Sequence, residues 1–213
     1  MNPLQPAPEN ATLLFNGNDL DNWETREGAS AEWSLEAGVM TVLPGAGDIM
    51  TRERLTDFQL HLEVCLPEMP EATGQARANS GVFLQGRYEI QVLDSFGLNI
   101  PGMGDCGGIY DQFAPLVNAN RAPLDWQTYD VVFRAARMAS DGNVANHARI
   151  SVIQNGLVVQ NNVEVHGPTG GALDHDLGAP GPLLLQDHGN MISYRNLWAI
   201  ELPLTGSDTY EPR

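Results

Sequence analysis

Apolar and polar side chains alternate along most of this chain. Between residues 58 and 64 every second residue is apolar, which is the period-two pattern of a half-buried strand. Similar short runs recur, with Gly, Pro, Asn and Asp between them: WSLEAGVMTVL, FQLHLEVCL, GVFLQ, YEIQVLD, TYDVVFRAA, ARISVIQNGLVVQ, PLLLQDH and MISYRNLWAIEL. Strands at this spacing without intervening helices predict an all-β fold, an antiparallel sandwich or barrel.

Two segments carry more specific local signals. Asn155-Gly156 lies between apolar runs and predicts a β-hairpin, because both residues tolerate the positive φ that a tight turn requires. Residues 124–139 can be written as a helix, but Tyr129, Val131 and Phe133 alternate with polar residues or a further valine. The β-branched and aromatic content therefore favours a strand there.

The chain divides simply along its length. Residues 1–11 are Pro-rich and are expected to lack structure of their own, residues 12–204 to form one β-sandwich, and residues 205–213 to form a C-terminal tail. Two Gly-rich segments, 95–125 and 166–181, exceed ordinary loop lengths. Loops this long in compact domains are typically functional or disordered, and the specific residues in these two, such as Tyr110 and His166, favour a functional role.

Composition narrows the choice of partner. A net charge of −16, from 27 acidic and 11 basic residues, argues against nucleic acid and against anionic membranes, which require clustered Lys and Arg. No apolar stretch has the length needed for membrane insertion. The N-terminus lacks a signal-peptide pattern, so the location is cytoplasmic, or periplasmic or secreted if a signal peptide has been removed. Oligomeric state is left open.

The two cysteines carry no recognisable chemistry. Cys65 lies in an apolar strand pattern and is interpreted as a small buried hydrophobe, and Cys106 lies in a long loop. Neither has the CxxC context of a redox or metal site, and their spacing does not decide whether they pair. We assign neither a catalytic role.

Residues 79–94 contain the strongest candidate for a site. They read as two strands joined by a Gly-Arg turn, and the second strand is YEIQVLD. Because side chains alternate along a strand, Glu89 and Gln91 share one face, and Tyr88, Ile90 and Val92 share the other. A carboxylate beside an amide on such a strand predicts a sheet surface that holds a polar ligand.

Several motifs in order resemble a known family. The segments LFNGNDLDNW, NSGVFLQGRYEIQVLDSFG, CGGIYDQFAP, WQTYDVVF, HGPTGG and GPLLLQDHGNMISYRNLWAIEL resemble, over residues 13 to 202, the 3-keto-disaccharide hydrolase family. The resemblance implies a concanavalin A-like jelly roll of two antiparallel sheets and action on glycosides oxidised at C3. Asn120 departs from the pattern, since a second loop cysteine pairing with the equivalent of Cys106 is expected there. That departure implies a looser loop.

The residues favour this chemistry over ordinary glycoside hydrolysis. A retaining glycosidase needs two carboxyl groups about 5 Å apart, whereas the face that carries Glu89 continues with Gln91 and Leu93. A 3-keto sugar needs one base to remove the C2 proton, a stabiliser for the enolate and an acid for the leaving oxygen. We therefore predict cleavage of 3-keto-glycosides by elimination and hydration. The alternatives are a non-catalytic, lectin-like glycan-binding module and, third, an ordinary glucanase.

Candidate roles follow from strand parity. Glu89 is the candidate base, His188 the base or acid, and Arg195 a holder of the keto oxygen. Leu184, Gln186 and His188 are expected to share one face; Ser193 and Arg195 to share another; and Asn196 and Trp198 to point the opposite way. The predicted substrate-binding residues are Asn79, Gln91, Asp94, Tyr110, Trp126, His166 and Gln186.

Plainer interpretations stand beside these. Glu89 would be structural if it paired with Arg87 or Arg195, and Arg195 is slightly better explained as the partner of a carboxylate across the sheet. Trp126 and Trp198 are more typical of a core than of a sugar platform, whereas His61 and Glu63 would extend the groove. Glu89, His188 and Asp94 would form a metal site if they met, although no ligand motif is present. No cofactor is identified, and structural calcium is an open expectation.

Overall fold

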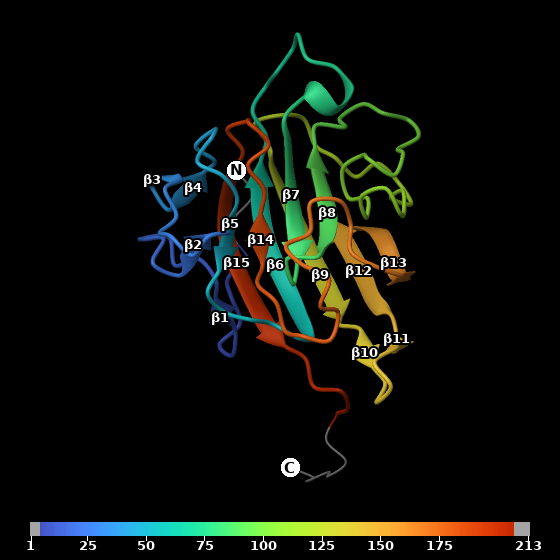
Figure 1. Ribbon diagram of the computed structural model, residues 1–213. Coiled ribbons are helices and arrows are strands. Elements are labelled where there is room, and N and C mark those ends of the chain that lie inside the picture. Colours follow the sequence, from blue (N-terminus) through green and yellow to red (C-terminus); the bar gives the residue numbers. More distant parts are fainter. Residues whose placement is uncertain (1–4, 207–213) are drawn as a thin grey trace, which may run out of the picture.

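The computed structural model describes residues 5–206 and is built almost entirely of strands (Figure 1). The strands are β1 Thr12–Leu13, β2 Trp23–Thr25, β3 Ser34–Glu36, β4 Val39–Thr41, β5 Ile49–Thr51, β6 Phe58–Cys65, β7 Asn79–Leu84, β8 Tyr88–Leu93, β9 Trp126–Arg134, β10 Arg137–Met138, β11 Val144–Asn146, β12 Ala148–Gln154, β13 Leu157–Val165, β14 Leu184–Leu185 and β15 Ser193–Glu201. One 3-10 turn, η1 Gly74–Ala76, precedes β7. The predicted all-β class is confirmed.

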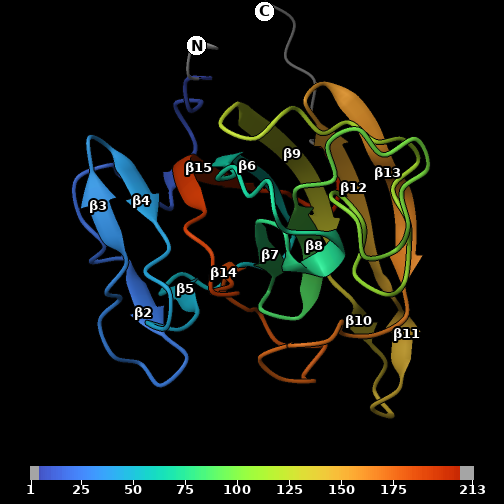
Figure 2. The ribbon, with the colours of Figure 1, turned by 90° about the horizontal axis from the view of Figure 1, so that it is seen from above.

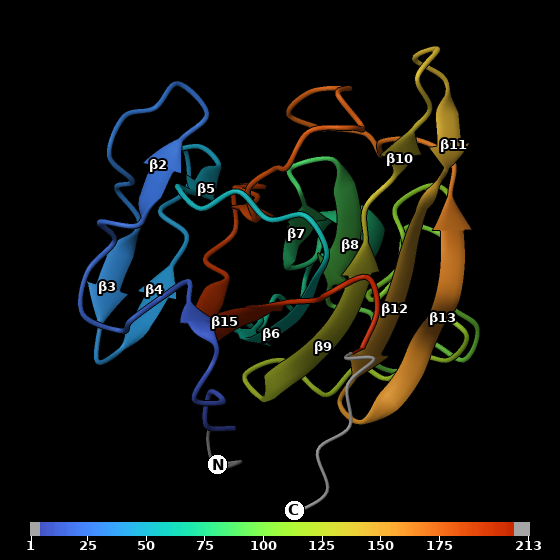
Figure 3. The same ribbon diagram turned by 90° about the horizontal axis from the view of Figure 1, so that it is seen from below.

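The strands form two antiparallel sheets. The larger has eight strands in the order β13-β12-β9-β6-β15-β4-β3, with β1 paired to β15, and the smaller has the order β2-β5-β14-β7-β8. Figures 2 and 3 show the larger sheet curving around the smaller one, with β7 and β8 facing β6 and β9. The short hairpin β10-β11 stands apart from both sheets. This is the predicted two-sheet sandwich.

The core lies between the sheets and follows the alternation in the sequence. Tyr88, Ile90 and Val92 from β8 are buried against residues such as Leu60 and Leu62 from β6. Burying one such aliphatic side chain contributes about 1.5–3 kcal/mol. The inward face of each strand is therefore fixed by apolar burial, and the polar residues of β8 are turned to the outer face of the smaller sheet.

Tight turns set the register of both main hairpins. Between β7 and β8 the residues with positive φ are Gln85 (52°) and Gly86 (67°), so the turn lies one residue earlier than the predicted Gly-Arg turn. Between β12 and β13 they are Asn155 (52°) and Gly156 (83°), which confirms the Asn-Gly hairpin. Two consecutive positive φ values match the twist of antiparallel strands.

The segment with an ambiguous pattern, residues 126–134, is the strand β9. It pairs with β6 on one side and β12 on the other, and Tyr129, Val131 and Phe133 point into the core. The strand interpretation of this segment is therefore confirmed.

Strand β15 departs from regular alternation. Its pairing with β6 shifts between Arg195 and Trp198, and Asn196 has φ 54°. This bulge turns Leu197 into the core, whereas Trp198 stacks on His61 on the other face, with ring centroids 5.1 Å apart. The prediction that Trp198 points opposite to Arg195 was wrong, because a bulge inserts one residue and reverses the parity beyond it.

The two long loops run along the free edge of β8. Gly107 and Gly108 exchange backbone hydrogen bonds with Gln91, and the Tyr110 amide donates to the Glu89 carbonyl. Nearer the turn, the Thr169 amide donates to the Arg87 carbonyl. Segment 166–181 crosses β7 and β8 in front (orange in Figure 1). The predicted functional loops are thus held against the strand that carries Glu89.

The ends of the chain add little to the sheets. Residues 5–11 form no strand, but the Gln5 carbonyl accepts a hydrogen bond from the Asn196 side chain. Residues 1–4 and 207–213, which include most of the predicted C-terminal tail, lie outside the described residues. Within the described part, no helix has the length and apolar character to cross a membrane.

Candidate functional site

A polar cavity of about 260 Å³ lies on the outer face of the smaller sheet, under the long loops. Six of the predicted site residues line it: Asn79, Glu89, Gln91, Tyr110, Gln186 and His188. They come from β7, from β8, from segment 95–125 and from the residues that follow β14. The predicted parity of Leu184, Gln186 and His188 is consistent with this, since Leu184 packs on the outer-face side chain Phe83.

A glycine makes room for the Glu89 carboxylate. Gly81 on β7 pairs with Gln91 on β8, and Phe83 pairs with Glu89. A Cβ atom placed on Gly81 would lie 2.4 Å from Glu89 Oε1. Because no side chain stands at this position, the carboxylate can lie back across the sheet toward β7 and β14.

The Glu89 carboxyl group is poorly solvated and has no cation beside it. The residue is 4% exposed, and within residues 5–206 no donor hydrogen-bonds to its carboxylate oxygens. Burial, reinforced by the negative charges of Asp111 and Asp48, raises the pKa of Glu89 to about 8. Loss of hydration without a compensating positive charge favours the neutral acid. The proposed pairings with Arg87 and Arg195 were wrong, since those residues bind Asp174 and Glu63.

Amide side chains form the floor beside Glu89. Gln91 Nε2 is 3.2 Å from Gln75 Oε1 and 3.4 Å from Asn79 Oδ1, and Asn79 Nδ2 also donates to Gln75. Gln75 in turn donates to the Gly104 carbonyl at 2.8 Å, which ties the floor to segment 95–125. Gln91 Oε1 is buried without a partner in the described part of the chain. It is therefore an acceptor available for a hydroxyl group.

The rim of the cavity holds groups that can move protons or pack on a ring. Tyr110 is half-buried, and burial, with smaller contributions from Asp111 and Glu89, raises the pKa of its phenol. His188 is exposed and also lines the cavity. Gln186 is positioned by its backbone amide, which donates to the Gly81 carbonyl at 3.0 Å. Gly170 and Gly171 complete the wall.

Arg195 and Trp126 lie elsewhere, which corrects two of the predicted roles. Both are on the outer face of the larger sheet, where Arg195 Nε donates to Glu63 Oε2 at 2.8 Å. The Arg195 guanidinium lies 3.9 Å from the centre of the Trp126 ring. The alternative interpretation, that Arg195 anchors a carboxylate across the sheet, matches this geometry. His61 and Glu63 belong to the same cluster and do not extend the cavity.

Asp94 and His166 are also outside the cavity. Asp94 follows β8, is 2% exposed and forms an ion pair with Arg77, so it is oriented away from the Glu89 face. It therefore does not meet Glu89 and His188 in a metal site. His166 packs edge-on against His147 at the end of β13. The loop that His166 begins does reach the cavity, but through its glycines.

The two cysteines are free. Cys65 is half-buried on the outer face of the larger sheet and not in the core, whereas Cys106 is buried and its Sγ lies 2.9 Å from the Tyr129 hydroxyl. Gln154 Nε2 links Cys106 Sγ to Asn120 Oδ1, so residue 120 does lie near Cys106. Asn120 also donates to the Leu93 carbonyl at 2.9 Å. Hydrogen bonds thus hold the loop at this point, where the sequence suggested that it would be looser.

Sequence reasoning missed several residues of the site. Gln75 lies in η1, in a segment without periodicity, and nothing in its surroundings signals a role. Asp48, which directly precedes β5, and Asp111, in segment 95–125, both raise the pKa of Glu89. Gly170 and Gly171 belong to the quoted HGPTGG motif, so their position had a signal that was not assigned to individual residues.

The fold and the cavity define a class: a two-sheet sandwich whose cavity has amide side chains on its floor and one carboxyl group, as suits a carbohydrate-active protein. Residues 10–200 match the family described as the 3-keto-alpha-glucoside-1,2-lyase-like domain. The chain belongs to this family, which confirms the resemblance seen in its motifs.

Solved structures agree with this assignment. A protein from Parabacteroides distasonis ATCC 8503, described as a candidate glycosyl hydrolase, is 42% identical, with a TM-score of 0.84 over 92% of this chain and 85% of that one. A second one from the same organism is 21% identical, with a TM-score of 0.67 over 92% and 95%, and shows the shared fold. A comparison with curated proteins gives no match. The family and the first relative support a carbohydrate-active function.

Proposed function

We propose that the protein cleaves glycosides whose C3 hydroxyl has been oxidised to a ketone, with Glu89 as the base. The observation that carries this proposal is the single carboxyl group among the residues that line the cavity. Double displacement at an ordinary glycoside needs two such groups about 5 Å apart. Abstraction of a proton next to a ketone needs one.

The reaction runs through an enolate. The Glu89 carboxylate takes the C2 proton, and the electrons of the C2–H bond form the C2–C3 double bond while the keto oxygen becomes negative. The enolate then collapses: a C1–C2 double bond forms, and the bond between C1 and the aglycone oxygen breaks. A proton from His188 or Tyr110 neutralises the leaving oxygen. Addition of water to C1 converts the unsaturated keto sugar into the net hydrolysis product.

The cavity is suited to the remaining tasks. Its amide floor offers the unpartnered Gln91 Oε1 to a sugar hydroxyl, and Tyr110 gives one wall an aromatic surface. A pKa of about 8 makes Glu89 a stronger base than an exposed carboxylate once it is ionised. The amide groups of Asn79, Gln91 and Gln186 take the place of Arg195 as candidate donors to the keto oxygen.

The test is an assay with α- and β-linked chromogenic 3-keto-glucosides beside the unoxidised glucosides. We expect aglycone release from a keto substrate and none from its unoxidised counterpart. If Glu89 is the base, kcat/KM increases with pH up to about 8 and then levels off, since the free enzyme must be ionised at Glu89. Binding of plain glycans without turnover of any keto substrate would indicate a lectin-like module, and cleavage of unoxidised glucosides an ordinary glucanase.

A further inference from the structure

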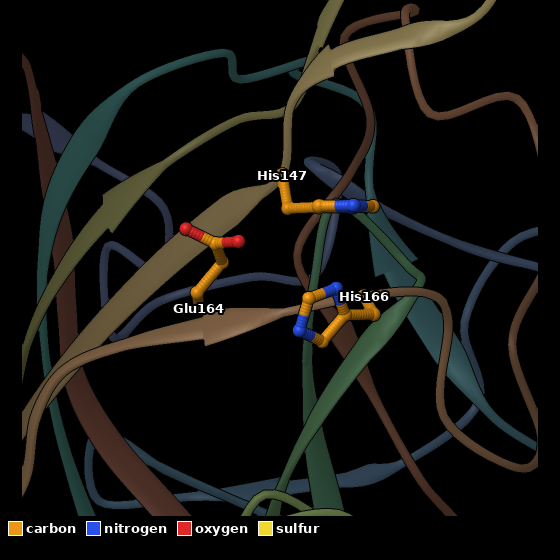
Figure 4. Close-up of side chains that lie close together, drawn as sticks. All are labelled: His147, Glu164 and His166. Carbon is orange, nitrogen blue, oxygen red and sulfur yellow. The ribbon is translucent and has the colours of Figure 1, made fainter.

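A second group of chemically active side chains lies outside the cavity that holds Glu89, at the edge of the larger sheet. His147, Glu164 and His166 come together where β12 begins and β13 ends (Figure 4). One nitrogen from each histidine and one Glu164 oxygen all lie within 4.8 Å of one another. Among the described residues, this is where three groups able to bind a metal meet.

The hairpin register produces this meeting. Ala148 pairs with Val165, so His147 and His166 stand at the next opposed positions, just beyond the ladder. Glu164 pairs with Arg149, and it lies two residues before His166, so the side chains of Glu164 and His166 point to the same face. The imidazole rings meet edge to face with centroids 4.5 Å apart. Figure 4 shows the three side chains around a common space, with His147 projecting from the start of β12 and Glu164 and His166 from the end of β13.

Two features point to a ligand in that space. His147 Nδ1 is buried and has no hydrogen-bond partner in the described part of the chain. An unpartnered buried nitrogen is costly, and a metal ion bound at Nδ1 would satisfy it. Glu164 is already fixed by an ion pair between Oε2 and Arg149. Ligating carboxylates commonly have such an outer partner, which orients them and leaves the second oxygen for the metal.

We propose that His147, Glu164 and His166 bind a divalent transition-metal ion of the Zn²⁺ type. Two imidazoles and one carboxylate form a donor set that suits Zn²⁺, with water at a fourth position on the exposed side of His166. Calcium is disfavoured here because it takes six to eight oxygen ligands. Bound metal would join the start of β12 to the first residue of segment 166–181.

This site has a structural consequence for the cavity. His166 precedes by three residues Thr169, whose hydroxyl accepts a hydrogen bond from the Glu89 amide at 2.9 Å. A metal at His166 would hold the near end of the cavity wall without contacting a sugar. The metal site is independent of the proposed reaction, and either proposal stands if the other fails.

Titration of the full chain with Zn²⁺ alone, followed by calorimetry, tests the proposal. We expect one ion per chain and an increase in the melting temperature on binding. Loss of an outer-shell group typically weakens metal affinity about 10- to 100-fold, so H166A or E164Q should weaken it by at least as much. The matched control is H175A, which removes another exposed histidine of the same segment and should bind as the unmodified protein does.

Circular dichroism establishes that each variant is folded before binding is compared. Replacement of Zn²⁺ by Co²⁺ gives a visible absorption band that should disappear in H166A and persist in H175A. The proposal is overturned if the unmodified protein binds no Zn²⁺, or if H166A and E164Q bind it as tightly as H175A does. The latter outcome would place the ion at other surface groups.

Discussion

Two buried glutamates, one on each outer face of the sandwich, have opposite electrostatic surroundings. Glu63 on the larger sheet is 2% exposed and Glu89 on the smaller sheet is 4% exposed. Glu63 accepts hydrogen bonds from Arg195 and Asn196, whereas the Glu89 carboxylate has no donor within the described residues and its pKa is raised to about 8. Similar burial thus gives an ion pair at Glu63 and a carboxyl group with a raised pKa at Glu89, because Glu63 has a cation beside it and Glu89 does not.

Substitution of both glutamates tests the comparison most directly. E89Q should lower kcat/KM toward a 3-keto-glucoside about 10²- to 10⁴-fold, the usual contribution of a general base. E63Q, made in the other sheet, should leave kcat per folded molecule close to that of the unmodified protein. Steady-state kinetics, normalised to the folded fraction, separates the two. Equal losses in both variants would remove the distinction between the two sites.

The second expected effect is on stability, and here E63Q should be the more damaging of the two substitutions. Removal of one partner of a buried ion pair typically costs about 3–5 kcal/mol, because the other charge stays buried. E63Q should therefore lower the free energy of unfolding by an amount near the lower end of that range, since Arg195 retains its stacking on Trp126. Denaturant unfolding at neutral pH measures it. A cost below about 1 kcal/mol, the range of surface pairs, would contradict the structural role.

The third effect concerns pH. The pKa of Glu89 is raised from 4.5 to about 8 in the folded protein, so the folded state holds this proton more tightly than the unfolded chain does. Its contribution to stability is fully present below about pH 4.5 and is lost as pH increases toward about 8. E89Q lacks this loss, so it should gain stability relative to the unmodified protein between pH 5 and pH 9, by about 2–4 kcal/mol.

Unfolding curves of both proteins across this pH range give the difference directly. A pH-independent difference would show that Glu89 titrates normally.

The smallest effect is expected at Gly81. A methyl group there would meet Glu89 Oε1 at 2.4 Å and Phe83 Cε2 at 2.8 Å, so the carboxylate must move. G81A should lower kcat about tenfold, since misplacement of a catalytic group by about 1 Å can cost as much as 10²-fold. G167A is the control, because a Cβ atom there meets nothing within 4 Å. Equal activity in G81A and the unmodified protein would show that the open space over Gly81 is not needed.

Much of the fold was predictable because the two-residue alternation of apolar side chains shows which face of each strand is buried. β6, β8 and β9 keep a period-two pattern over most of their length, so their inward and outward faces were assigned correctly. The face of β8 that carries Glu89 and Gln91 was assigned correctly for the same reason, and it proved to be the floor of the cavity.

The wrong predictions arise where the alternation of apolar and polar residues does not determine which sheet or face a side chain occupies. The pattern of β15 resembles that of β8, and only pairing shows that β15 belongs to the other sheet, so Arg195 was assigned to the wrong surface. The bulge at Asn196 then reversed the face of Trp198. Gln75 reaches the cavity through the path of a loop, which depends on long-range contacts and not on local sequence.

The covering of β8 has a consequence for any attempt to change the specificity of this protein. Residues 107–110 and Thr169 occupy the hydrogen-bonding groups along the outer edge of that strand. An uncovered edge is a template on which other chains can add strands and aggregate. Shortening either loop to admit a larger sugar would therefore expose an aggregation-prone strand edge. The same loop residues thus affect both the substrate range and the solubility of the protein. Replacing side chains within loops of unchanged length is the safer route to a new substrate.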